Sequence, residues 1–182
     1  MAEEEKKSII SLGSAAQRVA QERRAHQNDS AQALDFLDFM IGHWQGEGKH
    51  GDASLTGVLT VQRRLGGTFL EAHECLRNER GNLDYEDVTI YRYNASDQHL
   101  RVLQLVAPAW TSERFAFPLT DGPGVRWFGG PHVPTVVIRL EGAVLVSTVH
   151  HPQTHLVESW MRYQRTEPGQ DGAASPQTPD MD

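Results

Sequence analysis

The spacing of apolar residues divides the chain into two unequal parts. Before residue 42 apolar side chains recur at helical intervals, whereas from Trp44 to Arg165 apolar and polar residues alternate with a period of two. The alternating part predicts about ten strands. They are expected at 43–50, 54–65, 67–77, 83–94, 99–107, 109–117, 124–129, 134–140, 143–151 and 156–165.

Short turn sequences such as "NERGN" and "NASDQ" separate these strands. Connections of this length join antiparallel neighbours as hairpins. No helical pattern interrupts the run of strands, so we predict an all-β fold with N-terminal helices. The strands should form an up-and-down antiparallel β-barrel, because closure of a long meander removes its exposed edges.

Three parts are predicted along the chain. Residues 1–28 form a helical arm, residues 29–165 form the barrel, and residues 166–182 form a disordered tail. The tail has almost no large apolar residue and cannot offset the entropy cost of ordering. The arm is a loosely docked helix, a dimer contact or a frayed segment.

A second helix is predicted between Asn28 and Gly42. Asp29 or Ser30 would cap its first turn, and Gly42 would supply the left-handed residue that ends it. One broad face of this helix is apolar and must cover another part of the molecule. That face is formed by Leu34, Leu37, Met40 and Ile41.

The stretch "GHWQGEG" follows this helix. Alternation points Trp44 inward, where it would plug the closed end of the barrel, with Gly46, Gly48 and His50 on the same face. The two glycines are expected to leave room for an internal cavity. Trp44 and His50 are therefore candidate ligand-binding residues.

Charge and cysteine content narrow the function classes. The net charge is -7, the pI is about 5.7, and no Lys/Arg cluster is present, so we predict no nucleic-acid partner. Cys75 is the single cysteine, which excludes an internal disulfide. No run of about twenty apolar residues predicts a membrane span, and no secretion signal is recognised, so a cytoplasmic location is expected.

"GHWQGEG" resembles the Gly-x-Trp opening of lipocalin-type proteins, the calycins. It is more similar to the Gly-x-Trp-x-Gly-x-Gly opening of nitrobindin-like barrels and of a related group of uncharacterised bacterial barrels. Three later stretches also resemble that group: "LGGTFLEAHE", "VTIYRYNASDQHL" and "ESWMRYQR". The resemblance runs from Phe36 to Arg165 and implies a barrel with one internal pocket, but no particular reaction.

Nitrobindin-like members hold haem b through a histidine near the C-terminal strand. In "STVHHPQTHLVESW" the residue nearest to that position is His155. The resemblance therefore makes His155 the candidate cofactor-binding residue and haem b the candidate cofactor. The assignment requires that His155 does not lie on an exposed turn.

The predicted strand 67–77 has two faces of different chemistry. Glu71 and His73 share a face with Phe69 and Cys75. If that face lines the pocket, the carboxylate and the imidazole form a general acid/base pair. The alternative is that this face is solvated and that the opposite one faces inward; it carries Leu70, Ala72, Glu74 and Leu76.

The tyrosines of strand 83–94 share one face with Asp87 and Thr89. Tyr91 is a candidate catalytic residue and Tyr93 a candidate ligand contact, because phenol hydroxyls can orient a polar ligand atom. An aromatic ladder that stabilises the wall is the alternative.

Two arginines and a glutamate complete the candidate set. In the last strand Glu158 is a catalytic candidate, and Arg162 either pairs with a carboxylate ligand or stacks on Trp44 at the closed end. Arg114 presents the same choice. No metal site is predicted in "HHPQTH", because adjacent strand residues point in opposite directions.

No nucleotide-binding or hydrolase fingerprint is found in the chain. The first hypothesis is intracellular binding of a small, mostly apolar molecule, haem included, inside the barrel. The second is a small barrel enzyme, an isomerase, cyclase or hydratase, that uses acid/base residues in the cavity. A homodimer formed through the N-terminal helix is a third hypothesis.

Overall fold

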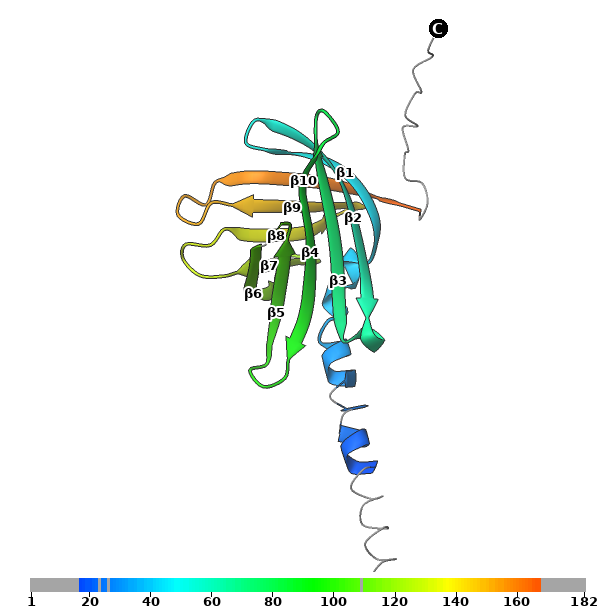
Figure 1. Ribbon diagram of the computed structural model, residues 1–182. Helices are drawn as coiled ribbons and strands as arrows, with labels where there is room; N and C mark the ends of the chain where they lie inside the picture. The colour runs from blue at the N-terminus through cyan, green and yellow to red at the C-terminus, as the bar shows by residue number, and fades with distance from the viewer. Residues whose placement is uncertain (1–16, 23, 26, 109, 168–182) are drawn as a thin grey trace, which may run out of the picture.

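The computed structural model describes residues 17–22, 24–25, 27–108 and 110–167. Helical turns occur up to residue 32, and a 3-10 helix, η1, spans Asp35–Met40. Ten strands follow in the described part of the chain (Figure 1). They are β1 (Gly42–His50), β2 (Ala53–Arg64), β3 (Phe69–Asn78), β4 (Leu83–Asn94), β5 (His99–Val106), β6 (Trp110–Pro118), β7 (Gly124–Phe128), β8 (Thr135–Glu141), β9 (Val144–His150) and β10 (Val157–Thr166). A short 3-10 turn, η2 (Leu65–Gly67), joins β2 to β3.

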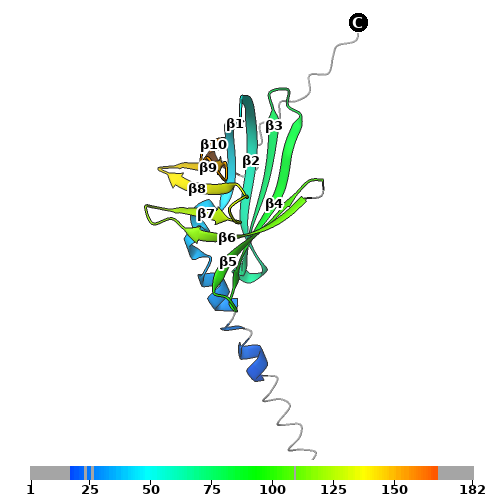
Figure 2. The same cartoon turned by 90° about the vertical axis from the view of Figure 1, so that its left-hand side faces the viewer.

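The strands form one closed antiparallel barrel. Each strand pairs with its neighbours in sequence, and β1 also pairs with β10, in a register that runs from His43–Thr166 to His50–Ser159. The two closing strands lie side by side in both views (Figures 1 and 2). The predicted up-and-down barrel of ten strands, preceded by helical structure, is confirmed.

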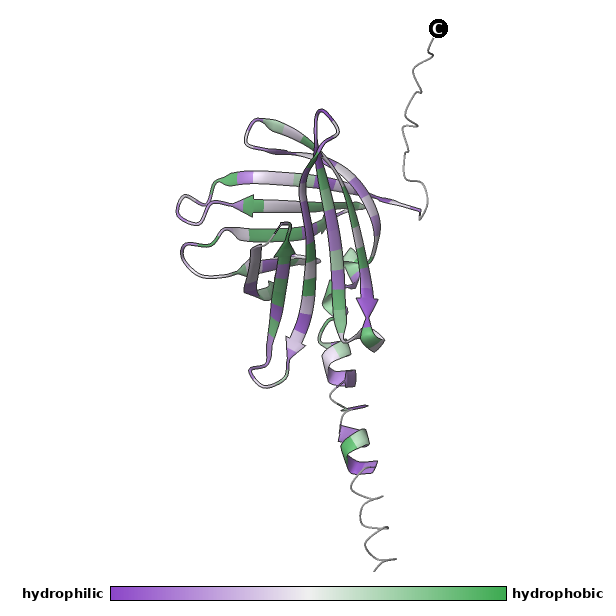
Figure 3. Ribbon diagram, in the orientation of Figure 1, coloured by the Kyte–Doolittle hydropathy of each residue, from purple (hydrophilic) through white to green (hydrophobic). Residues whose placement is uncertain are grey.

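Hydrophobic and hydrophilic residues alternate along the strands, as Figure 3 shows. In β2, for example, Leu55 and Leu59 are buried, whereas Thr56 and Val58 are exposed. The inward side chains form one core cluster that extends from η1 through the barrel. Burial of these apolar surfaces is the main favourable contribution to the stability of the fold.

One end of the barrel is closed by η1 and Trp44. Leu37 and Met40 of η1 are 0% and 1% exposed, and Trp44 is 1% exposed. The Trp44 indole Nε1 donates a hydrogen bond of 2.8 Å to the Met40 carbonyl oxygen. The guanidinium carbon of Arg165 lies 4.6 Å from the Trp44 ring centroid. Trp44 therefore faces inward as predicted, and the arginine that stacks on it is Arg165 rather than Arg162.

Arg63 of β2 fixes the helical segment to the barrel wall. Its Nη2 donates to the carboxylates of Asp35, at 2.8 Å, and Asp38, at 2.6 Å. Its Nη1 donates to the Ala31 carbonyl oxygen at 3.0 Å. One guanidinium thus binds a carbonyl oxygen that precedes η1 and two carboxylates within η1, and these contacts keep η1 packed on the end of the barrel.

The segment before β1 differs from the single helix expected between Asn28 and Gly42. Helical turns continue through Asn28, two turn residues follow residue 32, and η1 completes the segment. Gly42 begins β1, with a φ of 144° that favours glycine. Leu34, Leu37 and Met40 are three residues apart, so a 3-10 helix of three residues per turn places all of them on the barrel side.

The glycines of β1 make room for neighbouring side chains and not for a ligand. A Cβ atom on Gly46 would lie 2.3 Å from the Arg162 carbonyl oxygen and 2.6 Å from Cδ1 of Tyr163. One on Gly48 would lie 1.9 Å from the Trp160 carbonyl oxygen and 2.4 Å from Sδ of Met161. The expectation that these glycines hollow out the cavity is therefore corrected. They allow the β10 backbone and two large β10 side chains to approach the β1 backbone closely.

Some predictions concern residues outside the described part. Residues 1–16 and 168–182 lie outside it, so the helical arm, the disordered tail and the homodimer stay predictions. Among the described residues, no helix combines the length and hydrophobicity that a membrane crossing requires.

Candidate functional site: a cavity inside the barrel

A cavity of about 340 Å³ lies inside the barrel. Most of its wall is apolar: Met40, Leu55, Leu59, Ala72, Leu76, Val136, Ile138, Leu145 and Met161. A concave, mostly apolar space of this size, with a few polar groups directed into it, is typical of sites for small organic ligands.

The cavity opens at the end of the barrel away from η1. Its lining there includes His50, Asp84 and Trp110, which are all exposed. His50 ends β1, Asp84 is the second residue of β4, and Trp110 begins β6, so the three belong to one rim. A ligand that enters past this rim would meet Met40 of η1 at the floor.

One side of the cavity is a hydrogen-bonded network around Asp87, which is 4% exposed. The Tyr85 hydroxyl donates to Asp87 Oδ2 at 2.9 Å, and the Thr89 hydroxyl donates to the same oxygen at 3.2 Å. Gln104 Nε2 donates to this oxygen and to the Tyr85 hydroxyl. Burial raises the pKa of Asp87, and the hydrogen bonds from Gln104, Tyr85 and Thr89 oppose that rise.

Glu74 of β3 is the direct partner of Asp87 of β4, and both side chains line the cavity. The Tyr163 hydroxyl donates a hydrogen bond to Glu74 Oε1. Burial raises the pKa of Glu74 to about 7, and the neighbouring Asp87 carboxylate acts in the same direction. The hydrogen bond from Tyr163 acts against both effects. Two carboxyl groups therefore share an apolar space in which ionisation of both is costly.

Arg114 of β6 brings a cation to the cavity wall and is 6% exposed. Its Nη1 donates to the Pro134 carbonyl oxygen at 3.2 Å, and its Nε has no hydrogen-bond partner among the described residues. The hydroxyl of Tyr91 and the indole nitrogen of Trp127 are also buried there without a hydrogen bond of normal geometry. Buried polar atoms normally have partners, so these three are the least well satisfied polar atoms of the described cavity wall.

Glu71 and His73 do not face the cavity, so the structure shows the solvated alternative for this strand, and the two side chains do not form an acid/base pair in the cavity. Glu71 accepts hydrogen bonds from Arg64 on the outer wall, and the His73 side chain is 47% exposed. The arginine holds the pKa of Glu71 below its usual value. The face that carries Leu70, Ala72 and Leu76 buries more apolar area and therefore turns inward, together with Glu74.

The other two catalytic candidates lie in different places. Tyr91 lines the cavity and is 0% exposed. Glu158 is exposed on the outer wall, because alternation along β10 turns Ser159, Met161 and Tyr163 inward. Only Tyr91 of the four predicted catalytic residues could therefore touch a bound ligand.

The ligand-binding candidates are also divided. Arg114 and His50 line the cavity. Trp44 is buried at the closed end and Tyr93 is half-buried on β4, but neither belongs to the cavity lining. Arg162 faces solvent, 3.7 Å from the Glu141 carboxylate, so it cannot pair with a ligand inside the barrel.

His155 does not meet the condition set for a haem ligand. It lies on an exposed turn between β9 and β10 with a φ of 58°. Its carbonyl oxygen is 3.2 Å from Nδ1 of His150. His50 at the rim is the only histidine of the described residues that lines the cavity. The residues present therefore do not fit the proposed haem site.

Glu74 and Asp87 were missed as site residues. The available signal was that Glu74 is the one carboxyl residue on an otherwise apolar face, with Leu70, Ala72 and Leu76. A single charged residue on a buried face is costly unless it has a structural or functional partner. Asp87 follows from the pairing of β3 with β4, which the sequence pattern does not give.

No family model matches this chain, and no curated protein sequence matches it. The fold and the cavity define the class to which the protein belongs, a closed up-and-down antiparallel barrel of ten strands, which is consistent with a calycin-like fold.

Proposed function

We propose that the protein binds a small, mostly apolar molecule that carries a hydrogen-bond donor, with the donor directed at Glu74. The observation that carries this proposal is the combination of a cavity of about 340 Å³ and a mostly apolar wall with the buried carboxyl groups of Glu74 and Asp87 on one side. Ligand sites commonly combine an apolar body with a few polar groups that fix orientation.

The choice of a donor follows from the hydrogen-bond capacity of the two carboxyl groups. Oδ2 of Asp87 already accepts from three side chains. Glu74 accepts one hydrogen bond, from Tyr163, and so keeps acceptor capacity toward the cavity. A hydroxyl or amine group on the ligand could donate a hydrogen bond to Glu74. A ligand carboxylate would instead be repelled by both acids.

The resemblance to nitrobindin-like barrels agrees with a binding function, but the haem assignment is not part of the proposal because His155 lies outside the cavity. An enzymatic activity would depend on Glu74, Asp87 and Tyr91, since the other three catalytic candidates face solvent. The cytoplasmic location stays a prediction.

A fluorescent probe tests the proposal. N-phenyl-1-naphthylamine is neutral and apolar, and its emission rises in apolar surroundings, so titration of the full chain gives a dissociation constant. Ser147→Phe places a ring in the cavity and should weaken binding at least about tenfold. Thr56→Phe adds the same ring to the exposed face of β2 and should leave the dissociation constant unchanged. Equal binding by both variants would overturn the cavity as the site.

Displacement of the probe tests the orientation. Decylamine, decanol and decanoic acid share one apolar chain and differ in the polar group. The amine and the alcohol should displace the probe at lower concentration than the acid, and Glu74→Ala should reduce this preference, because only Asp87 then remains to repel the acid. If decanoic acid is the best competitor in the wild-type protein, Arg114 rather than Glu74 orients the ligand.

A further inference from the structure

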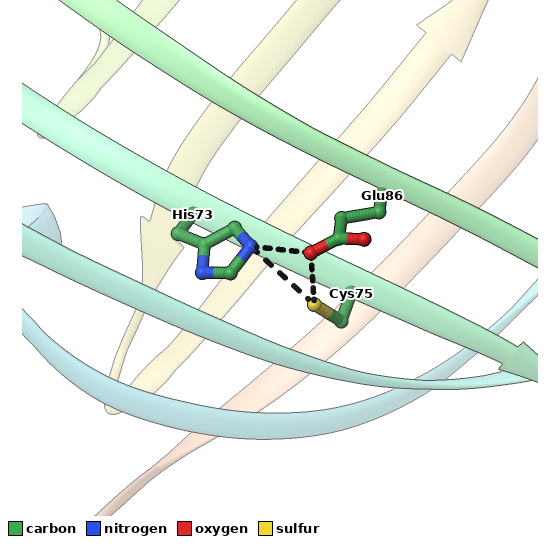
Figure 4. A group of neighbouring side chains, drawn as sticks. All are labelled: His73, Cys75 and Glu86. Carbon is green, nitrogen blue, oxygen red and sulfur yellow. Dashed lines mark hydrogen bonds and ion pairs between the residues drawn. The ribbon is translucent and has the colours of Figure 1, made fainter. Parts of the chain in front are cut away.

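The outer faces of β3 and β4 bring a histidine, a cysteine and a glutamate together (Figure 4). Nε2 of His73 lies 3.0 Å from Oε1 of Glu86, and Sγ of Cys75 lies 3.6 Å from the same nitrogen. The Cys75 sulfur is 3.8 Å from the Glu86 oxygen. All three ligand-type atoms therefore face one point on the outside of the barrel.

The geometry of the sheet produces this arrangement. His73 and Cys75 are two residues apart on β3, so their side chains share a face. Glu86 of β4 is the register partner of Cys75. Both strands are hydrogen-bonded on either side within the closed barrel, which holds their backbones in place. A ligand set on such strands loses less entropy on binding than one on a loop.

The distances match those of a tetrahedral zinc site. Zinc binds imidazole nitrogen at about 2.0–2.1 Å, thiolate sulfur at about 2.3 Å and carboxylate oxygen at about 2.0–2.2 Å. At tetrahedral angles these lengths place nitrogen and oxygen about 3.3 Å apart and sulfur about 3.5–3.6 Å from each. The observed separations of 3.0, 3.6 and 3.8 Å agree with those values to within about 0.3 Å.

We propose that His73, Cys75 and Glu86 bind a zinc ion on the outer wall of the barrel, with a water molecule as the fourth ligand. The side chains of His73 and Glu86 are 47% and 39% exposed, so solvent has access to the remaining coordination position. Three protein ligands and one open position are the arrangement that catalytic zinc sites use.

Charge and ligand type both favour zinc. A thiolate and a carboxylate together neutralise the divalent ion, and one ligand each of nitrogen, sulfur and oxygen suits a metal of borderline softness. Among the neighbouring charges, the positive charge of Arg77 acts on the Cys75 thiol and disfavours a cation. The Glu71 carboxylate acts on His73 in the opposite direction, but its ion pair with Arg64 offsets part of this effect. The zinc site lies on the opposite side of the sheet from the cavity, so it does not rest on the proposed ligand binding.

Thiol chemistry gives a readout specific to this site, because Cys75 is the only cysteine in the chain. In the metal-free full-length protein, prepared with EDTA and then desalted, Cys75 reacts with a disulfide reagent such as DTNB. One equivalent of zinc should slow that reaction at least about tenfold, since a coordinated thiolate is no longer a free nucleophile. Zinc bound elsewhere on the surface would not protect Cys75.

Variants identify the ligands. Glu86→Gln and His73→Gln should each weaken the zinc protection of Cys75 by at least about tenfold to a hundredfold, the loss typical even of residues that only support a ligand. Glu113→Gln is the matched control, because Glu113 is another outer-wall glutamate in an ion pair, with Arg92. In the Glu113→Gln protein, zinc should protect Cys75 to the same extent as in the wild-type protein.

Cobalt gives a second measurement that does not depend on reaction rates. Co²⁺ bound by Cys75 should produce a thiolate-to-metal charge-transfer band, which Cys75→Ser should abolish while the circular dichroism spectrum stays native. A hydrogen-bonded trio without metal affinity would show neither the band nor zinc protection, and that result overturns the proposal. Equal protection in wild-type, Glu86→Gln and His73→Gln proteins would also overturn it.

Discussion

Two polar clusters lie on opposite faces of β3 and β4. Their residues are neighbours in the sequence, but the two clusters differ in their exposure to solvent. Glu74 and Asp87 face the cavity, and the network around Asp87 leaves it 4% exposed. His73 and Glu86, each one residue away, are 47% and 39% exposed on the outer wall. The same backbone therefore provides one low-dielectric and one solvated group of side chains, and the dielectric decides what each can do.

For the interior cluster, removal from water raises the pKa of Glu74 to about 7 and costs stability whenever both acids ionise. For the outer cluster, solvent access allows an ion to bind and a water molecule to complete its coordination. Substitutions at matched inner and outer positions should therefore have effects of different size.

The largest difference is expected between two tryptophans. Trp44→Ala should lower the free energy of unfolding by about 3–5 kcal/mol, because it leaves a hole at the closed end and removes the hydrogen bond to Met40. Trp160→Ala, on the half-buried outer face of β10, should cost only about 1 kcal/mol. Urea unfolding followed by circular dichroism measures both.

Should Trp44→Ala fail to fold, Trp44→Phe can be measured in its place. It keeps most of the ring volume, so its loss of unfolding free energy should lie between those expected for Trp44→Ala and Trp160→Ala. Equal losses for the two alanine variants would mean that Trp44 does not close the barrel.

The second prediction concerns pH. The Glu74 pKa is about 7 in the folded protein and near the ordinary 4.5 in the unfolded chain. Between these values the folded state keeps a proton that the unfolded state has released, so stability should fall as pH rises through this window. The loss should reach the order of 2–3 kcal/mol by about pH 8. Glu74→Gln cannot ionise and should remove the Glu74 part of this slope in urea unfolding, whereas the raised pKa of Asp87 leaves a smaller slope of the same sign.

Glu86→Gln is the outer-wall control for that experiment. Measurements in EDTA keep the outer cluster free of metal, and under those conditions this variant should keep the wild-type slope. A wild-type slope in Glu74→Gln would assign the pH dependence to another group.

The third prediction removes one hydrogen bond from the interior cluster. Tyr163→Phe should cost about 1–2 kcal/mol at about pH 8, where Glu74 is ionised and the lost bond is charge-assisted, and less at about pH 5. Because this hydrogen bond holds the Glu74 pKa down, its loss should also move the pH-dependent transition upward. Tyr93 is a half-buried residue whose hydroxyl makes no hydrogen bond among the described residues, so Tyr93→Phe should change neither the stability nor the midpoint of the transition.

The fold could be predicted because it depends on local patterns. Alternation placed the strand 83–94 at the bounds of β4, and the hairpin-length turns gave the antiparallel order. The inward direction of Trp44 followed from the same alternation, and its burial confirms it.

The site could be predicted only in part, because it depends on register and on contacts between strands. The two faces of β3 were identified from the sequence, but which one turned inward depended on the sum of buried apolar area. Glu86 joins His73 and Cys75 only through the pairing of β3 with β4. Arg165 rather than Arg162 reaches Trp44 because the two arginines lie on opposite faces of β10.

The smallest effect is expected at the outer ion pair of Arg92 and Glu113. Their side chains are 48% and 46% exposed, and the Nη2 to Oε1 distance is 3.1 Å. Arg92→Ala should lower the free energy of unfolding by no more than about 0.2–1 kcal/mol, because solvent and salt screen the attraction and both side chains lose entropy when they pair. A double-mutant cycle with Glu113→Ala measures the coupling directly. A coupling as large as the loss in Tyr163→Phe would contradict the view that the dielectric, and not the number of contacts, separates the inner from the outer wall.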